Sequence, residues 1–329
     1  MRLATLFIFL FLVKGCIQAQ QMPQFSQVSM NRSLYNPAYL GYEDKTMITL
    51  GGRWQMIGFG NEPQSAFLNF ERNIKIKAKP IYNPAMHISM PIPDDNRTQN
   101  SKFSQTFGGQ LSSDKYGAFK SFQFAGLYAG HYKFTNSLKL SAGVKIGISN
   151  NGFDADKAQV LNVNNPEIEY QGGDTEYDEF TAEKSNTNIL NLGLGMNIQF
   201  GDFFIGAAAN QLTKNSIQFG RSTLNFNLTS HFFLMTGYNF QLTEEFKVLT
   251  TVVVKKMSPA PTSLEVSVIG NFGDVIFAGV NYHHKATAGV IVGFQVSPAF
   301  RIGYSFDASS NNIIQSSFGG HELVLNYRF

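Results

Sequence analysis

Leu138-Lys-Leu-Ser-Ala-Gly-Val-Lys-Ile-Gly-Ile-Ser149 is the stretch that decides the fold, because apolar residues alternate along it with polar residues and glycine. Successive side chains of a β-strand point to opposite faces, so this segment has one apolar and one polar face. The same alternation recurs at residues 188–200, 300–307 and 323–329. Such segments predict an all-β structure in which each strand separates an apolar environment from a polar one.

The composition agrees with a large β structure and excludes several other classes. Only 15% of the 329 residues are charged and 14% are aromatic, yet the mean hydropathy is −0.12. A disordered chain has few aromatic residues. A disulfide scaffold needs many cysteines, whereas this chain has one. A helical membrane protein needs repeated apolar runs of about 20 residues, and a net charge of +3 is small for a nucleic-acid-binding protein.

The first nineteen residues have the pattern of a secretory signal peptide. Arg2 supplies the positive start, Leu6–Val13 forms a short apolar core, and Ala19 is a small residue before the expected cleavage point. A lipoprotein site with an acylated Cys16 is the alternative, although Lys14 does not suit such a site. Removal of the signal peptide takes away Arg2, Lys14 and Cys16, which leaves a mature chain of net charge +1 without cysteine.

Two architectures satisfy strands with one apolar face: a soluble sandwich buries that face, and a transmembrane barrel turns it to lipid. Aromatic residues gather at the strand ends, as in the interfacial girdles of outer-membrane barrels. The opposite face carries Lys, Asn, Gln and Gly rather than a second apolar set. Finally, the chain stops on an aromatic residue in an alternating strand, like the signal read by the outer-membrane insertion machinery; this signal comprises Leu325, Tyr327 and Phe329.

We therefore predict a transmembrane antiparallel up-and-down β-barrel in the outer membrane, in contact with its lipid. The expected segments are a signal peptide at 1–19, an N-terminal periplasmic or luminal segment at 20–43, and the barrel at 44–329. Fourteen strands are expected, with a range of 12 to 16: 44–58, 62–75, 104–112, 119–135, 138–150, 187–200, 202–213, 225–241, 246–256, 262–272, 274–284, 287–297, 300–309 and 318–329.

An even number of strands places both mature termini at the periplasm. The tight turns, such as Gly201-Asp202, then fall on the periplasmic side, and the long connection 151–186 falls outside. The exception is the long periplasmic connection 76–103. It contains a further candidate hairpin at Ala85–Met90, which would raise the strand count to sixteen.

The sequence contains no pattern that predicts catalysis. Its six histidines show no metal-ligand spacing and have no cysteine partners, and there is no Gly-x-Ser-x-Gly elbow. We expect no catalytic residue, no metal and no cofactor. The strand glycines, Gly143 and Gly195 among them, are interpreted as suited to a crowded, curved barrel wall.

Two charge clusters are candidates for partner binding. The outer connection is strongly acidic, and its densest part is Asp174, Glu176, Asp178 and Glu179. This loop is either a solvated, self-repelling segment, a calcium site, or a docking surface for a secreted protein. On the periplasmic side a basic patch either snorkels at the membrane interface or contacts an acidic periplasmic partner; it consists of Arg72, Lys75, Lys77 and Lys79.

The start of the mature chain carries a distinctive motif. Its residues are Pro23, Gln24, Phe25, Ser26 and Gln27, then Asn31, then Tyr35, Asn36, Pro37, Ala38 and Tyr39, and finally Gly41. This motif resembles the start of the PorP/SprF family of outer-membrane proteins, which belong to the type IX secretion and gliding-motility system. Arg53, Gln55 and Gly58 in the first hairpin look related too, although Trp54 directly follows Arg53, where the family tends to place it after Arg-x-Gln.

Physically, the motif is a polar, proline-punctuated stretch with aromatic anchors. A residue before proline disfavours the helical conformation, so Asn36 should be extended. The segment is expected to plug the lumen, to brace the periplasmic mouth, or to cap the edge of the barrel.

The resemblance implies an accessory role in type IX secretion rather than catalysis. The implied partners are a secreted cargo with a C-terminal sorting domain, such as a large adhesin, and periplasmic components of the secretion apparatus; no nucleic acid is expected. The hypothesis is that the barrel holds the cargo's C-terminal domain during export or surface anchoring. The alternative is a passive or fatty-acid-type uptake channel, in which the N-terminal segment would be the hatch.

Overall fold

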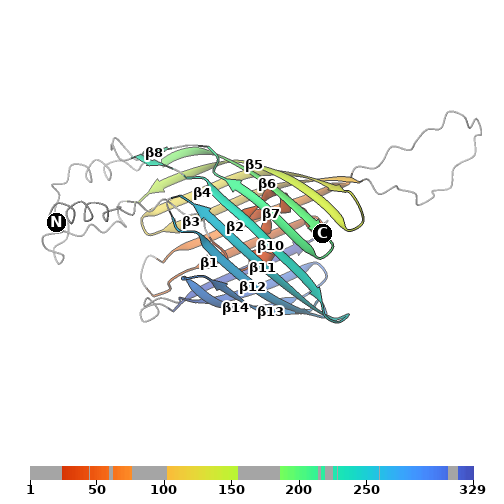
Figure 1. Ribbon diagram of the computed structural model, residues 1–329. Coiled ribbons are helices and arrows are strands. Elements are labelled where there is room, and N and C mark those ends of the chain that lie inside the picture. The colour runs from red at the N-terminus through yellow and green to blue at the C-terminus, as the bar shows by residue number, and fades with distance from the viewer. Residues whose placement is uncertain are drawn as a thin grey trace, which may run out of the picture.

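The structure is a computed structural model that describes residues 24–43, 45–58, 62–75, 102–154, 186–213, 216–218, 225–227, 229–258, 260–309 and 318–329. Most of these residues belong to β-strands (Figure 1). No helix in the described part of the chain is long and apolar enough to cross a membrane.

Fourteen antiparallel strands form one closed barrel, in which β1 pairs with β16 to complete the ring. Every other strand pairs with its neighbours in sequence, except that β7 pairs directly with β10. The strands are β1 (Met47–Trp54), β2 (Gln64–Lys75), β3 (Phe103–Tyr116), β4 (Phe119–Lys133), β5 (Leu138–Phe153), β6 (Asn186–Phe200), β7 (Phe203–Asn210), β10 (His231–Gln241), β11 (Phe246–Met257), β12 (Ser263–Phe272), β13 (Ile276–His283), β14 (Thr287–Gln295), β15 (Phe300–Ser309) and β16 (Gly320–Arg328). Between β7 and β10, β8 (Ser216–Gln218) and β9 (Asn225–Asn227) form a separate two-stranded sheet.

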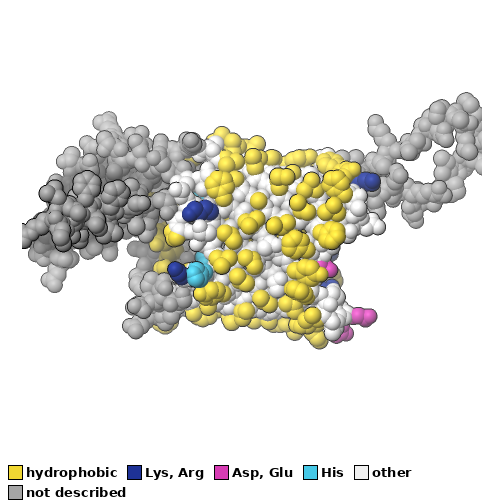
Figure 2. Space-filling view, in the orientation of Figure 1, with side chains coloured by type: hydrophobic (Ala, Val, Ile, Leu, Met, Phe, Trp, Pro, Cys, Tyr) yellow, Lys and Arg dark blue, Asp and Glu magenta, His cyan; other side chains and the backbone are white. Residues whose placement is uncertain are grey.

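The alternation in the sequence becomes the division between lipid and lumen. On β5, Lys145 is 1% exposed inside the barrel, while the neighbouring Ile146 is 58% exposed on the outside. The last strand follows the same rule, with Glu322 and Asn326 buried and Tyr327 turned outward. Figure 2 shows the resulting outer surface: hydrophobic side chains cover the visible face of the barrel, and the described charged side chains lie towards its two ends.

The expected count of fourteen strands is confirmed, and the sixteen-strand alternative is wrong. Because β2 pairs directly with β3 and β1 pairs with β16, the ring closes without a further hairpin. Ala85–Met90 lies outside the described residues.

Several strand boundaries differ from the expectation by a few residues, and two of these differences are informative. β3 continues to Tyr116 because its polar residues Ser112–Asp114 keep pairing with β4, and Asp114 also accepts a hydrogen bond from Ser65. The expected strand 225–241 is interrupted: its first residues pair with β8 in the separate sheet, and only His231–Gln241 enters the barrel. Alternation continues through 225–241, so pattern alone could not locate that boundary, whereas it is lost in the polar run Ser112–Lys115 although the strand continues.

The two ends of the barrel are assigned by the lengths of their connections. Short turns such as Gly201-Asp202 lie at the same end as the C-terminal Phe329, which corresponds to the periplasmic end of outer-membrane barrels. β5 ends and β6 begins at the opposite, outer end.

The mature N-terminus, which the parity argument places at the periplasm, lies outside the described residues, but the start of the described N-terminal segment can be located. Ser26 contacts Arg53 and Glu322, which face each other one position from the outer end of the β1–β16 pair. The described N-terminal segment therefore starts in the outer half of the lumen rather than at the periplasm. It runs to Glu43, which bonds to Arg328 at the periplasmic end of β16.

Candidate functional site: the luminal plug

Residues 24–43 form a plug inside the barrel. The segment contains three short helices, η1 (Val28–Met30), α2 (Arg32–Tyr35) and η2 (Pro37–Tyr39). Every residue from Phe25 to Gly41 except Ser29 is buried. The plug therefore packs closely against the wall along almost its whole length.

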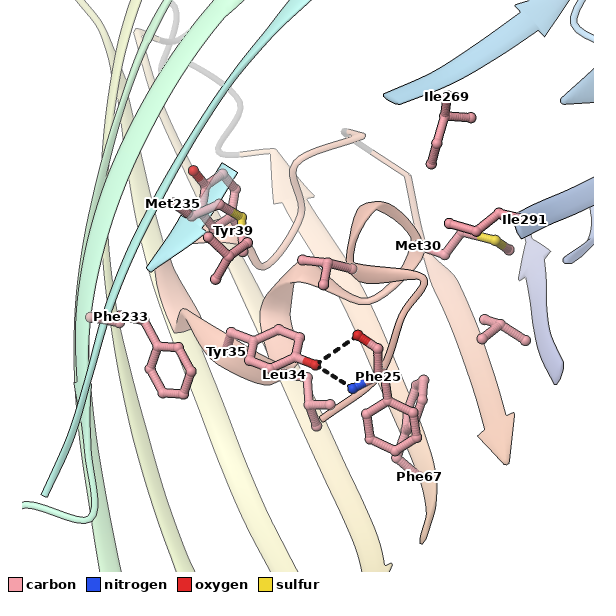
Figure 3. Close-up of a cluster of buried hydrophobic side chains, with 14 of the residues drawn as sticks. Phe25, Met30, Leu34, Tyr35, Tyr39, Phe67, Phe233, Met235, Ile269 and Ile291 are labelled. Carbon is pink, nitrogen blue, oxygen red and sulfur yellow. Dashed lines mark hydrogen bonds between the residues drawn. The ribbon is translucent and has the colours of Figure 1, made fainter. Parts of the chain in front are cut away.

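The motif residues themselves set the plug's local structure. Asn36 is extended (φ −136°, ψ 112°), as expected for a residue before proline, and its side chain accepts a hydrogen bond from the Ala38 N–H at 2.9 Å. Pro37 starts η2, where its missing N–H costs nothing. The Tyr35 hydroxyl closes the plug on itself, since it accepts from the Phe25 N–H at 2.8 Å and donates to the Phe25 carbonyl at 3.3 Å (Figure 3).

Apolar side chains of the plug meet apolar side chains that point inward from the wall (Figure 3). Phe25 packs edge-on against Phe67 of β2, with ring centroids 4.7 Å apart, and Tyr35 packs against Phe233 of β10 at 5.5 Å. The sequence interpretation expected a polar lumen. The lumen instead contains this apolar cluster as well as polar side chains. The wall residues in this cluster are Phe67, Phe204, Ala208, Phe233, Met235, Val253, Ile269, Phe277, Ile291 and Val324.

A cluster of buried charges holds the start of the plug; we call Arg53, Asp307 and Glu322 the clasp. Arg53 lies 3.0 Å from Asp307 and 3.2 Å from Glu322, and all three side chains are at most 9% exposed. The Glu322 carboxylate accepts from the N–H groups of Ser26 (2.6 Å) and Gln27 (3.0 Å). The Ser26 hydroxyl donates to Asp307 at 2.5 Å and accepts from Arg53.

A carboxylate outside the clasp holds the end of the plug. Glu71 on β2 accepts from the Ser33 hydroxyl at 2.7 Å and from the Gly41 N–H at 2.8 Å. Gly41 has φ +69°, and a Cβ there would lie 2.2 Å from the Thr106 hydroxyl oxygen, so only glycine fits this motif position.

Three glycines on adjacent strands make room for Asn36 and Pro37. A Cβ at Gly143 would lie 2.4 Å from the Pro37 carbonyl carbon, and one at Gly195 would lie 2.0 Å from the Asn36 side-chain oxygen. Gly206 is similarly close, at 2.9 Å from the Asn36 side-chain nitrogen. That nitrogen donates to the wall carbonyls of Met196 (3.1 Å) and Ala207 (3.3 Å). These glycines allow contact with the plug, whereas the sequence interpretation connected them only with curvature.

The remaining contacts distribute the plug's attachment around the ring. The Arg32 guanidinium lies over the rings of Tyr42 (4.5 Å) and Phe204 (4.6 Å). Asn210 on β7 donates to the Tyr35 carbonyl at 2.7 Å, and Asn326 on β16 donates to the Met30 carbonyl at 3.4 Å.

The structure brings together almost all of the motif. Pro23 lies outside the described residues; the other motif residues lie in the lumen, and these are Gln24, Phe25, Ser26, Gln27, Asn31, Tyr35, Asn36, Pro37, Ala38, Tyr39 and Gly41. Of the three expected positions for this segment, the lumen is the one observed. Leu325 and Tyr327 are on the outward-facing side of β16, and Phe329 is the residue that follows this strand. The rings of Tyr327 and Phe329 are in edge-on contact, with centroids 4.8 Å apart.

The two charge clusters are not tested by this geometry. Asp174, Glu176, Asp178 and Glu179 of the outer connection lie outside the described residues, as do Lys77 and Lys79. Lys75 is the last residue of β2, and Arg72 is exposed on the same strand. In the part of the chain that the structure describes, no group of three or more His, Cys, Asp or Glu residues could hold a metal ion.

Sequence reasoning missed the wall residues that bind the plug. Glu71 and Asn210 were not singled out, Arg53 was noted only as part of the first hairpin, and its contacts with Asp307 and Glu322 were not predicted. The signal present was a charged side chain at an inward-facing strand position, which is costly unless it is paired. The partner could not be read from the sequence, because Ser26 and Glu322 are 296 residues apart.

The closed barrel with its lipid-facing apolar surface and packed lumen defines the protein as a plugged outer-membrane β-barrel. Residues 17–327 match the family described as "Type IX secretion system membrane protein PorP/SprF". The chain belongs to this family, as its N-terminal motif predicted. No curated protein matches the chain.

Several solved barrels have a similar fold at low identity. The toluene transporter TodX of P. putida is 11% identical, with a TM-score of 0.47 and coverage of 91% of this chain and 93% of that one. A Pseudomonas aeruginosa FadL homologue is 12% identical, with a TM-score of 0.48 and coverage of 94% and 95%. Omp33 of Acinetobacter baumannii is 8% identical, with a TM-score of 0.45 and coverage of 87% and 99%. Similarity at this level says nothing about function.

Proposed function

We propose that this protein is an accessory component of type IX secretion, which binds the C-terminal domain of a cargo protein at the outer membrane. The proposed cargo is a large gliding or adhesin-type protein, and the role is export or surface anchoring rather than catalysis. Family membership over residues 17–327 is the observation that carries the proposal.

The packed lumen supports a binding role. Residues 25–41 fill the centre of the ring and are held by wall strands around it, including β2, β7, β15 and β16. A folded cargo domain therefore meets this protein at its outer or periplasmic rim, where the aqueous turns are. Periplasmic secretion components are proposed to meet the periplasmic rim.

Single-cysteine cross-linking tests where the cargo binds. The only cysteine is Cys16, within the predicted signal peptide, so an introduced cysteine is the sole thiol of the mature chain. We choose His284→Cys at an outer turn and Asn136→Cys at a periplasmic turn, both exposed. The matched control is Ile146→Cys, which is 58% exposed on the lipid-facing surface.

The expected result is a cross-linked adhesin or sorting domain from one rim position and none from the lipid-facing control. Deletion of the gene should also abolish surface display of that cargo. Unchanged display after deletion, or equal capture from all three positions, would overturn the proposal.

The uptake-channel alternative predicts a different result from the same purified protein. A channel gives steady conductance in planar bilayers, whereas a barrel with a packed plug gives little. If a disulfide that fixes the plug to the wall abolished the conductance, ions would pass only when the plug moves. That result would favour the channel.

A further inference from the structure

A second region of the lumen lies below the plug, at the periplasmic end; we call it the vestibule. It is an open cavity of about 680 Å³ between the β12–β13 turn and the β14–β15 turn. This volume lies within the range of ligand-binding pockets, which is about 300–1,000 Å³. Its lining includes Lys45, Asn271, Asp274, Phe277, Arg301 and Arg328.

The inner end of the vestibule lies against the side chains that pack around the plug. Phe277 lines the vestibule and also belongs to the buried cluster that packs around the plug. Glu43, the last described plug residue before β1, bonds to Arg328 on the vestibule wall at 2.9 Å. A ligand that enters from the periplasm therefore reaches a dead end, which suits the end of a chain better than a loop.

Arg301 is the most distinctive side chain in the vestibule. Its guanidinium lies 4.0 Å above the Phe277 ring and donates a hydrogen bond to the side-chain oxygen of Asn271 at 3.1 Å. The Arg301 Nε is buried without a hydrogen-bond partner, and no carboxylate among the described residues forms an ion pair with this guanidinium. A buried donor without a partner is costly, so this arginine is set up to bind an acceptor.

The charges around Arg301 favour a singly charged anion. Arg328 is paired with Glu43, and Lys247 lies 3.9 Å from Asp274, which leaves Arg301 and Lys45 as the excess positive charge among the described groups here. Asp274 and Glu43 would repel a doubly charged phosphate more strongly than a carboxylate. Stacking on Phe277 fixes the guanidinium plane, and a planar carboxylate can accept two parallel hydrogen bonds within that plane.

The remaining lining suits a peptide. Val275, Val296 and Pro298 give it apolar surface. The NH₂ group of the Gln295 side chain donates hydrogen bonds to the carbonyls of Ser297 (2.6 Å) and Phe300 (3.4 Å). Its side-chain oxygen is thus an acceptor for a peptide N–H.

We propose that the vestibule is a binding site for the C-terminal carboxylate of a protein tail presented from the periplasm, with Arg301 as its main ligand. The ligand class is an extended chain end with a free carboxylate and an apolar last residue. This proposal goes beyond the proposed cargo contact and does not depend on it.

The test measures fluorescence anisotropy of a dye-labelled peptide, Ser-Gly-Ala-Val-Leu with a free C-terminus, against the purified full-length barrel in detergent. We expect saturable binding that weakens at least about tenfold when the C-terminus is amidated, because a charge-assisted hydrogen bond is lost. Arg301→Gln should weaken binding by a similar factor. Arg301→Lys should restore only part of it, because the forked geometry is lost.

Lys120→Gln, at the outer end of the barrel, is the matched charge-removing control and should bind as the wild type does. Fluorescence of Trp54, the only tryptophan, confirms that each variant is folded. Equal binding of the acid and amide peptides, or unchanged binding by Arg301→Gln, would overturn the proposal. Laurate or inorganic phosphate that binds at Arg301 while the peptide does not would also overturn it, in favour of a fatty acid or a phosphate.

Discussion

Two luminal arginines have opposite surroundings. Arg53, in the outer half, lies within 3.2 Å of two buried carboxylates and also donates to Ser26 of the plug. Arg301, in the periplasmic half, has one hydrogen bond to a neutral amide and a ring beneath it. Both point inward from the same barrel, so strand position alone does not explain the difference.

The comparison distinguishes a charge that stabilises the fold from a charge that is available to bind a ligand. A buried ion pair gains little over an apolar replacement, but removal of one member is strongly destabilising. Arg53 therefore holds the plug and the wall together, whereas Arg301 has binding capacity that the described chain does not use. Four substitutions test this contrast, in order of decreasing effect on stability.

Arg53→Met should have the largest effect. It leaves Asp307 and Glu322 buried without their cation, which should lower the free energy of unfolding by about 3–5 kcal/mol. Urea unfolding in detergent, followed by Trp54 fluorescence, measures this loss. The triple variant with Asp307→Asn and Glu322→Gln should regain part of the stability. A single-variant loss below about 1 kcal/mol would contradict the structural role of the clasp.

Gly195→Ala should have an intermediate effect. Its new Cβ would lie 2.0 Å from the Asn36 side-chain oxygen and 3.0 Å from the Pro37 ring. Such overpacking costs about 1–3 kcal/mol. The control is Gly126→Ala on the outer surface, where the nearest atom is the Ile146 oxygen at 3.9 Å. Equal stabilities of the two variants would show that the plug does not press on the glycine wall.

Arg301→Gln should destabilise less than Arg53→Met. It removes a cation–π contact, worth about 2 kcal/mol when desolvated, and a hydrogen bond to Asn271, but it leaves no buried carboxylate without its cation. The same urea measurement applies, together with the peptide-binding assay. A stability loss as large as that of Arg53→Met would remove the distinction between the two arginines.

Lys120→Ala should have the smallest effect. Lys120 pairs with Asp154 at 2.5 Å at the outer rim, but its side chain is 47% exposed. Exposed pairs contribute about 0–1 kcal/mol and are screened by salt. Unfolding midpoints in low and high salt should therefore show a small difference that disappears as the salt concentration rises.

Much of the barrel was predictable because its signal is local. Alternation over 138–149 is enough to identify which side chains of β5 face lipid, and the same rule assigns Tyr327 and Glu322 at the other end of the chain. The strand count followed from repetition of this rule. It failed at 225–241, where the alternation continues although only His231–Gln241 joins the barrel.

By itself, the sequence determined the barrel, its lipid-facing surface and, through the N-terminal motif, the family. The tertiary structure decided what the motif does: residues 24–43 lie in the lumen, where Ser26 meets Glu322, and Asn36 and Pro37 meet glycines of three strands. The physical reason is the separation along the sequence over which each signal acts. Side-chain direction repeats every two residues along one strand, but the partner of a buried polar group lies wherever closure of the ring brings it.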